Sequence, residues 1–265
     1  MNLFTFSGGM HFEDQPEMMG RLKDRRTFLT AVGAGVLAVT SFFWMQKLPE
    51  QGTIISLVQN DREASADTAE RYPEHKHIIT TVFWVGEPES DDEENNNDNI
   101  HNRSSVWVED WTAAYGGVDD PDNRCGYQPC GFEPKENPFY FALPFNDYNS
   151  KGLKPAKELE AIPWYDGHVE EGKSILKNRW IEITYEGKKV YSQWEDAGPF
   201  GEDDADYVFG TDRPQELRAG LDVSPAVADY VGLDGRGKTS WRFIDEADVP
   251  PGPWRETITR SDPQW

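Results

Sequence analysis

The sequence predicts a mainly β domain with short helices and long acidic loops, preceded by one N-terminal hydrophobic helix. Short runs rich in β-branched and aromatic residues recur from residue 77 onward, and clusters of Gly, Pro, Asn and Asp separate them. Residues 27–46 carry no charge, which is typical of a membrane helix or a signal segment. Residues 89–99 contain no apolar side chain, so we expect an exposed loop there.

The chain is strongly acidic. Its 265 residues include 26 Lys and Arg against 48 Asp and Glu, which gives a formal net charge of −22. Such an excess favours a solvated acidic surface and predicts no basic face for nucleic acid. Aromatic residues reach 13%, with 10 Trp. They can fill a core or present flat faces to sugar rings, and composition does not choose between the two.

The N-terminal part predicts export. Residues 1–24 are polar, and residues 25–46 begin with the letters RRTFL ahead of the apolar run. This pattern resembles a twin-arginine signal, and the run is long enough to anchor the chain in a membrane through residues 27–46. Positive residues on its N-terminal side place the rest of the chain outside, in the periplasm or the extracellular space. An uncleaved anchor and a removed signal both stay open.

A linker and then a folded domain are expected after this segment. Residues 47–76 contain few apolar side chains, so we assign them to the linker and residues 77–265 to the domain. The first strand is expected at 77–85 and another at 139–145, because β-branched and aromatic side chains are dense in both.

A β-hairpin is expected in the middle of the domain. Apolar residues alternate over 180–185 and again over 190–194, and the four residues between them include a Gly suited to a turn. The second strand runs directly into Glu195 and Asp196, and Gly198-Pro199 then forces a turn. A strand that ends in an acid and a fixed turn can hold that acid rigidly at a cleft.

The remaining elements are shorter. Aromatic side chains at helical spacing predict an amphipathic helix within 104–115, with Ser105 as its N-cap. Ser224 as N-cap, with Pro after it and a Gly two turns later, predicts a second helix. Short strands are expected at 207–210 and 241–244.

Cys125 and Cys130 are the chain's two cysteines. Around a Gly and a Pro they could close a small disulfide loop in an oxidising compartment, and unpaired small core residues are the alternative. None of the five histidines stands at ligand spacing from the pair, so we expect no zinc, and we expect no cofactor. The loop at 89–99 lacks the spacing and the central Gly of a calcium loop.

Three short motifs resemble those of the double-psi β-barrel, in the order that this family has them. Residues 142–145 (ALPF) are similar to its TLPF, residues 196–200 (DAGPF) to its DRGPF, and residues 221–225 (LDVSP) to its IDLSP. The resemblance is to rare lipoprotein A and, more remotely, to expansins and small double-psi endoglucanases. It covers about residues 77–246 and implies a six-stranded barrel.

The resemblance also implies candidate catalytic residues. Rare lipoprotein A enzymes cleave peptidoglycan strands non-hydrolytically and use the aspartate of DRGPF, which is Asp196 here. The acid of a later motif in expansins and the endoglucanases corresponds to Asp222. The family's histidine before TLPF falls on Tyr140, and Glu87 is a loose substitute for the endoglucanase base. Without the resemblance, each acid also has a structural interpretation. Asp196 could stabilise the turn through an Asx interaction, and Asp222 could cap the helix that follows it.

Two functions follow as hypotheses. The first is an exported cell-envelope or extracellular protein that binds a polysaccharide, peptidoglycan or β-glucan, as expansins are thought to. The alternative is a glycan-cleaving enzyme of lytic transglycosylase or glycoside hydrolase type with Asp196 as acid or base. Aromatic and acidic residues beside the motifs are the candidates for substrate binding: Trp84, Glu87, Tyr140, Trp194 and Glu195. The short segments 135–140 and 193–196 also resemble those of a set of exported bacterial double-psi proteins with no assigned activity.

Overall fold

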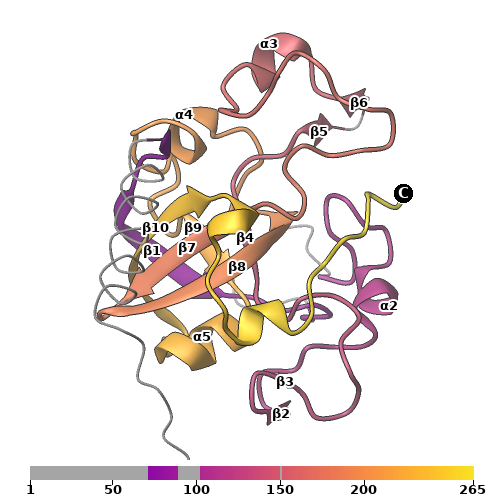
Figure 1. The fold of residues 1–265 in the computed structure, drawn as a ribbon, viewed down its shortest axis with the longest axis vertical. Helices are drawn as coiled ribbons and strands as arrows, with labels where there is room; N and C mark the ends of the chain where they lie inside the picture. The colour runs from indigo at the N-terminus through magenta and orange to yellow at the C-terminus, as the bar shows by residue number, and fades with distance from the viewer. Residues whose placement is uncertain (1–70, 89–101, 150) are drawn as a thin grey trace, which may run out of the picture. The chain divides into compact units, whose positions relative to one another are not determined.

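The computed structural model describes residues 71–88, 102–149 and 151–265, and in these the chain closes a mixed six-stranded β-barrel (Figure 1). The expected signal or anchor, the polar N-terminus, most of the linker and the acidic loop at 89–99 lie outside the described residues. Around the barrel the strands follow the order β1-β10-β7-β8-β4-β9. Their bounds are β1 His75–Val82, β4 Tyr140–Leu143, β7 Trp180–Tyr185, β8 Lys188–Ala197, β9 Leu221–Val223 and β10 Arg236–Ile244.

The barrel combines parallel and antiparallel pairs. The β1–β9 and β4–β8 pairs are parallel, and the other neighbours are antiparallel. This confirms the predicted mainly β, six-stranded architecture and is compatible with a double-psi barrel. Within the described part of the chain, no helix has the length and apolar character needed to cross a bilayer.

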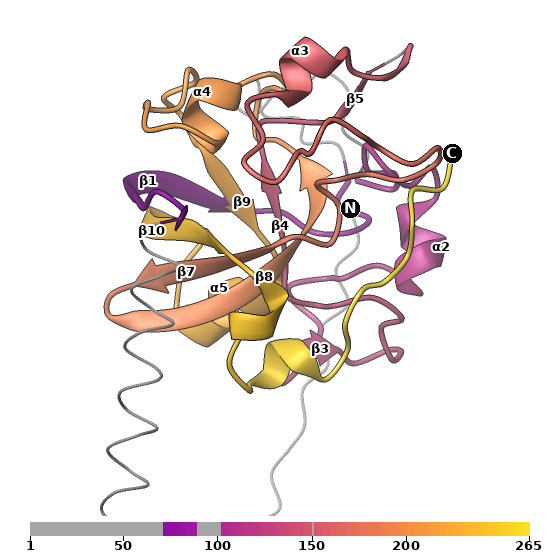
Figure 2. The same ribbon diagram turned by 45° about the horizontal axis from the view of Figure 1, so that its top comes forward.

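Short elements lie outside the barrel (Figures 1 and 2). Two small hairpins pair β2 with β3 and β5 with β6, and Cys125 and Cys130 are joined by a disulfide across the first of them. The bounds are β2 Arg124–Cys125, β3 Gln128–Pro129, β5 Tyr148–Asn149, β6 Gly152–Leu153, α2 Trp111–Tyr115, α3 Ala156–Leu159, α4 Ala205–Val208, α5 Pro225–Val231, η2 Glu246–Asp248 and η3 Pro253–Arg255.

The predicted central hairpin is present as β7–β8. Its register runs from Trp180 opposite Gln193 to Tyr185 opposite Lys188, so the turn is two residues long instead of the expected four. Glu186 and Gly187 occupy this turn with φ of 47° and 81°. Positive φ at both central residues matches the twist of the flanking strands, which is why the strands continue up to the turn.

Helix α5 also forms as predicted. The Ser224 side chain accepts a hydrogen bond from the amide of Val227, Pro225 occupies the first helical position, and Gly232 ends the helix in the left-handed conformation. Two other expectations were wrong. Residues 207–210 were expected as a strand, but residues 205–208 form α4. Helix α2 covers only the end of 104–115 because the side chain of Asp110, rather than Ser105, caps it.

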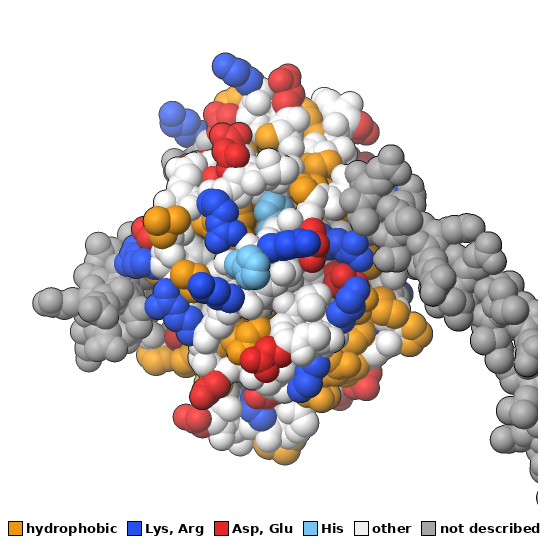
Figure 3. Space-filling model, turned by 90° about the vertical axis from the view of Figure 1, so that its left-hand side faces the viewer, with side chains coloured by type: hydrophobic (Ala, Val, Ile, Leu, Met, Phe, Trp, Pro, Cys, Tyr) orange, Lys and Arg blue, Asp and Glu red, His pale blue; other side chains and the backbone are white. Residues whose placement is uncertain are grey.

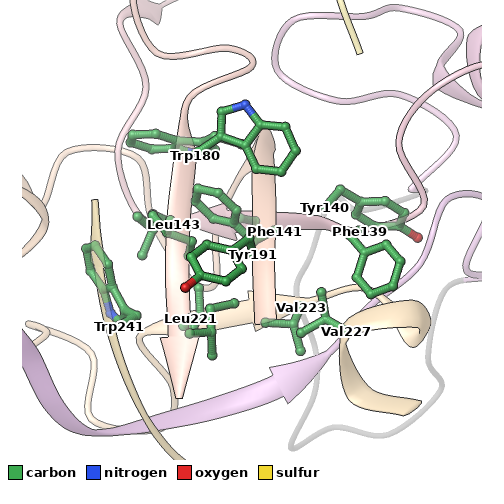
Figure 4. Packing of buried hydrophobic residues seen from close by; sticks show 14 of the residues in the cluster. Phe139, Tyr140, Phe141, Leu143, Trp180, Tyr191, Leu221, Val223, Val227 and Trp241 are labelled. Carbon is green, nitrogen blue, oxygen red and sulfur yellow. The ribbon is translucent and has the colours of Figure 1, made fainter. Parts of the chain in front are cut away.

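Aromatic residues mainly fill the core (Figure 4). Phe141 stacks on Trp194 with ring centroids 5.7 Å apart, and Phe209 stacks on Phe243 at 5.9 Å. The tryptophans among the largest fully buried side chains are Trp107, Trp111, Trp180, Trp194 and Trp241. These five tryptophans pack in the core, so core packing and not sugar binding accounts for their share of the high aromatic content.

The acidic excess is unevenly distributed over the surface. Figure 3 shows one face where Lys and Arg side chains gather with His. Two exposed cations, Lys76 on β1 and Lys238 on β10, lie on neighbouring strands. Arg213 donates hydrogen bonds to the carbonyls of Lys76 and His77, so a third cation lies beside β1. The net charge therefore does not describe every face of the molecule.

Candidate carboxylate site

A β-bulge in β8 sets the direction of the Asp196 side chain. Phe141 pairs with Trp194, but the next residue of β4, Ala142, pairs with Asp196, so Glu195 is an extra residue in β8. In a regular strand Trp194 and Asp196 would point to the same face, and Trp194 lies in the core. The extra residue turns Asp196 to the opposite face, beside Ala142.

Asp222 reaches the same face from the other side of β4. It pairs with Ala142 in the antiparallel β4–β9 ladder, between the fully buried Leu221 and Val223. Asp222, Ala142 and Asp196 thus form one row across three adjacent strands. Two strand spacings separate the Cα atoms of the two acids by about 10 Å, and Ala142, which is 2% exposed, lies between them.

Asp196 is held by main-chain donors. Its Oδ1 accepts hydrogen bonds from the amides of Val106 and Ala197, both at 2.9 Å. After it, the amide of Gly198 donates to the carbonyl of Leu143 at 3.0 Å, so the predicted Gly-Pro turn is fastened to β4. The residue is only 6% exposed. Burial raises the pKa of Asp196 to about 7, and the charges of Glu202 and Asp222 add to this against the two amides.

Glu87, which lies outside the row, interacts electrostatically with Asp222. Burial and then the charge of Asp222 raise the pKa of Glu87 to about 7, although Asn102 donates a hydrogen bond to its Oε2 at 2.7 Å. Burial likewise raises the pKa of Asp222 to about 6 against the hydrogen bond that Thr81 donates to its Oδ1. Within the part of the chain described, none of the three carboxylates has an ion-pair partner.

The arrangement suits proton transfer. Carboxyl groups that titrate near neutral pH and repel one another exist as mixtures of acid and base, so one can donate a proton while another accepts one. In the residues that the structure covers, no group of three or more His, Cys, Asp or Glu is arranged to hold a metal ion.

Three of the expected substrate-binding side chains are buried. The hydroxyl of Tyr140 donates to Asp119 Oδ2 at 2.9 Å and accepts from the amide of Val85 at 3.0 Å. Trp194 packs in the core, and Glu195 is 1% exposed with its Oε2 2.6 Å from Lys177 Nζ. These three side chains contact the protein interior and present no surface to a polymer.

Glu195, next to Asp196 in the sequence, belongs to a separate buried network. Burial raises the pKa of Glu195 to about 7, and the charge of Lys177 opposes this shift. Lys177 also donates to Ser261, whose hydroxyl donates to Glu136. The network ties the C-terminal segment to β8, so it is structural.

The candidate site therefore consists of Glu87, Asp196 and Asp222, with Trp84 half-buried on the segment that carries Glu87. Sequence reasoning missed the roles of Ala142 and Val106. A small residue within an apolar strand and a main-chain amide in a loop carry no chemical signal. No protein-family model and no curated protein matches this chain.

Proposed function

We propose that this protein cleaves a glycan chain, with Asp196 and Asp222 carrying the acid and base steps and Glu87 adjusting the charge of Asp222. The observation that carries the proposal is the row in which the two acids flank Ala142 without a cation among the described residues. Burying carboxylates without an ion-pair partner is costly even where they accept hydrogen bonds, so such clusters are typical of working sites.

The chemistry needs two proton transfers. One carboxyl group gives its proton to the bridging oxygen as the bond from that oxygen to the anomeric carbon breaks. A water molecule or a hydroxyl of the same sugar attacks the anomeric carbon, and the second carboxylate takes the proton of the attacking group. Attack by water gives a reducing end, whereas attack by the sugar's own hydroxyl gives an anhydro-sugar end.

Binding of a polysaccharide without cleavage is the second candidate function. Two observations weigh against cleavage and so leave binding as the other candidate: Asp196 is only 6% exposed, and Tyr140, which stands where the resembled family has a histidine, is fully buried. In this case the half-buried Glu87 and Asp222 would accept hydrogen bonds from sugar hydroxyls, and the polymer would dissociate unchanged.

Product analysis separates the two functions. The purified protein is incubated at pH 5, 6 and 7 with peptidoglycan and with β-glucans, and soluble products are identified by mass spectrometry. Anhydro-sugar or new reducing ends would support cleavage, whereas pelleting with the polymer and no product would support binding alone. Neither product nor pelleting with any of these polymers would contradict both.

We further propose that the protein is exported by its twin-arginine-type signal and works in the periplasm or outside the cell, with residues 27–46 as an anchor if they are retained. The charge-free run and the arginine pair before it support this placement. An oxidising compartment also suits the Cys125–Cys130 disulfide.

Changing Arg25 and Arg26 together to Lys is expected to keep the protein in the cytoplasm. The export machinery recognises the arginine pair itself, so an equal charge does not replace it. Cell fractionation and immunoblotting measure the distribution, with Lys23→Arg as a control that leaves the pair intact. Normal export of the double Lys variant would show that this signal is not used.

A further inference from the structure

The last residue of the chain, Trp265, is a solvent-exposed tryptophan in a molecule whose other described tryptophans are buried or half-buried. Trp265 is 60% exposed. A single exposed apolar residue is ordinary on a protein surface and by itself indicates nothing. The surroundings of Trp265 distinguish it from such a residue.

The C-terminus is fastened to the loop before α2. The amide of Gln264 donates to the carbonyl of Trp107 at 2.7 Å, and the amide of Glu109 donates to the carbonyl of Gln264 at 2.8 Å. Chain ends are usually poorly ordered unless main-chain bonds of this kind hold them. In Figures 1 and 2 the C-terminal tail runs alongside the segment that leads into α2.

The indole ring is also held from its edge and its side. Trp265 Nε1 donates to the carbonyl of Val106 at 3.3 Å, and the ring of Tyr148 lies 4.6 Å from it, centroid to centroid, at 46°. Tyr148 is itself fixed by its hydroxyl, which donates to the carbonyl of Lys173 at 2.7 Å. The indole is therefore oriented by its neighbours in a residue that stays exposed to solvent.

Val106 connects this ring to the carboxylates. Its amide donates to Asp196 Oδ1 at 2.9 Å, while its carbonyl accepts from Trp265. These two hydrogen bonds and the three covalent bonds between the Val106 nitrogen and oxygen limit the distance from Trp265 Nε1 to Asp196 Oδ1 to about 10 Å or less. A ligand whose reacting bond lies at Asp196 would place its next unit near the indole.

We propose that Trp265, oriented by Tyr148 and Val106, is a stacking platform for one neutral pyranose ring of the glycan that reacts at Asp196. This inference rests on the proposed function and assigns a binding subsite to it. A pyranose presents apolar C–H faces and hydroxyl edges, which suit a flat indole beside hydrogen-bonding groups. The nearby carboxylates disfavour an anionic ring, so the class is a neutral hexose or N-acetylhexosamine unit.

The test compares Trp265→Ala with Tyr127→Ala in the full-length protein. Tyr127 is the matched control because it is 37% exposed and its ring packs on Phe139 and Tyr230, near the disulfide hairpin rather than the C-terminus. Calorimetric titration with β-glucan and N-acetylglucosamine oligosaccharides gives Kd. Loss of the stacking surface should weaken binding about tenfold in Trp265→Ala, and Tyr127→Ala should bind like the parent.

Trp265→Phe keeps a ring and should bind within about threefold of the parent, which separates stacking from loss of fold. Unchanged Kd in Trp265→Ala, with a parent that binds, would overturn the platform and leave the proposed function standing. A lower kcat at unchanged Kd would also overturn it, since Trp265 would then only position Val106. A parent that neither binds nor cleaves any glycan would overturn the proposed function and the platform together.

Discussion

Asp196→Asn is expected to lower glycan turnover at least about a hundredfold while the protein stays folded, because the amide cannot donate or take up the proton that cleavage requires. Asn keeps the shape of Asp, and its Oδ1 can still accept the amide hydrogen bonds of Val106 and Ala197. The measurement is the initial rate of product release from the polymer that the parent cleaves, with circular dichroism to confirm the fold.

Asp196→Ala separates the catalytic hypothesis from the turn hypothesis. The methyl group accepts no hydrogen bond, so two main-chain amides lose their partner, and at pH 4.5 or below, where the folded Asp196 is protonated, the free energy of unfolding should fall by about 1–3 kcal/mol. If Asp196 only stabilises the turn, the Asn variant should keep the stability and the activity of the parent, whereas the Ala variant should lose part of each. An Asn variant as active as the parent would end the case for Asp196 as a catalytic residue and favour the binding function.

The contribution of the three site carboxyls to the free energy of unfolding is expected to fall as the pH rises from about 4 to 8. Their pKa values are raised by folding, to about 7 for Glu87 and Asp196 and about 6 for Asp222, from 4.5 or 3.8. The folded protein therefore binds these protons more tightly than the unfolded chain. Their contribution is complete below pH 4 and is lost through pH 6 to 7.

The pH effect can be isolated with the same variant. Urea unfolding of the parent and of Asp196→Asn at pH 4.5, 6 and 8 gives the difference that Asp196 makes. At about 1.4 kcal/mol per pKa unit, the stability of Asn relative to the parent should be higher at pH 8 than below pH 4 by at most about 4 kcal/mol, and at pH 4.5 only about 1 kcal/mol of this gain should remain. A difference that does not change with pH would contradict the raised pKa of Asp196.

The difference in stability between the parent and Asp196→Asn excludes the contributions of other titrating groups, some of which change stability with pH in the opposite direction. Burial lowers the pKa of His75 to about 4, so the folded state favours the neutral imidazole. The contribution of His75 is present above its unfolded pKa of 6.5 and is lost as the pH falls through 4. Because parent and variant share His75, it cancels in the difference. A variant that becomes both less active and more stable above pH 7 would show the trade-off expected of an active site.

Local patterns in the sequence were enough to predict several elements. Alternating side chains around a Gly predicted the β7–β8 hairpin, and Ser224, Pro225 and Gly232 predicted α5 with its caps. These features depend on residues a few positions apart, whose conformational preferences and hydrogen bonds act within the segment. The six-stranded barrel was predicted only through the resemblance of three motifs.

The candidate site was decided by contacts between distant segments. The bulge at Glu195 turned Asp196 away from the core, and β4 brought Asp222 into its row. A bulge depends on the register with a partner strand, and no period within β8 reveals it. The same register buried Trp194 and Glu195, two residues that their sequence position had made candidates for substrate binding.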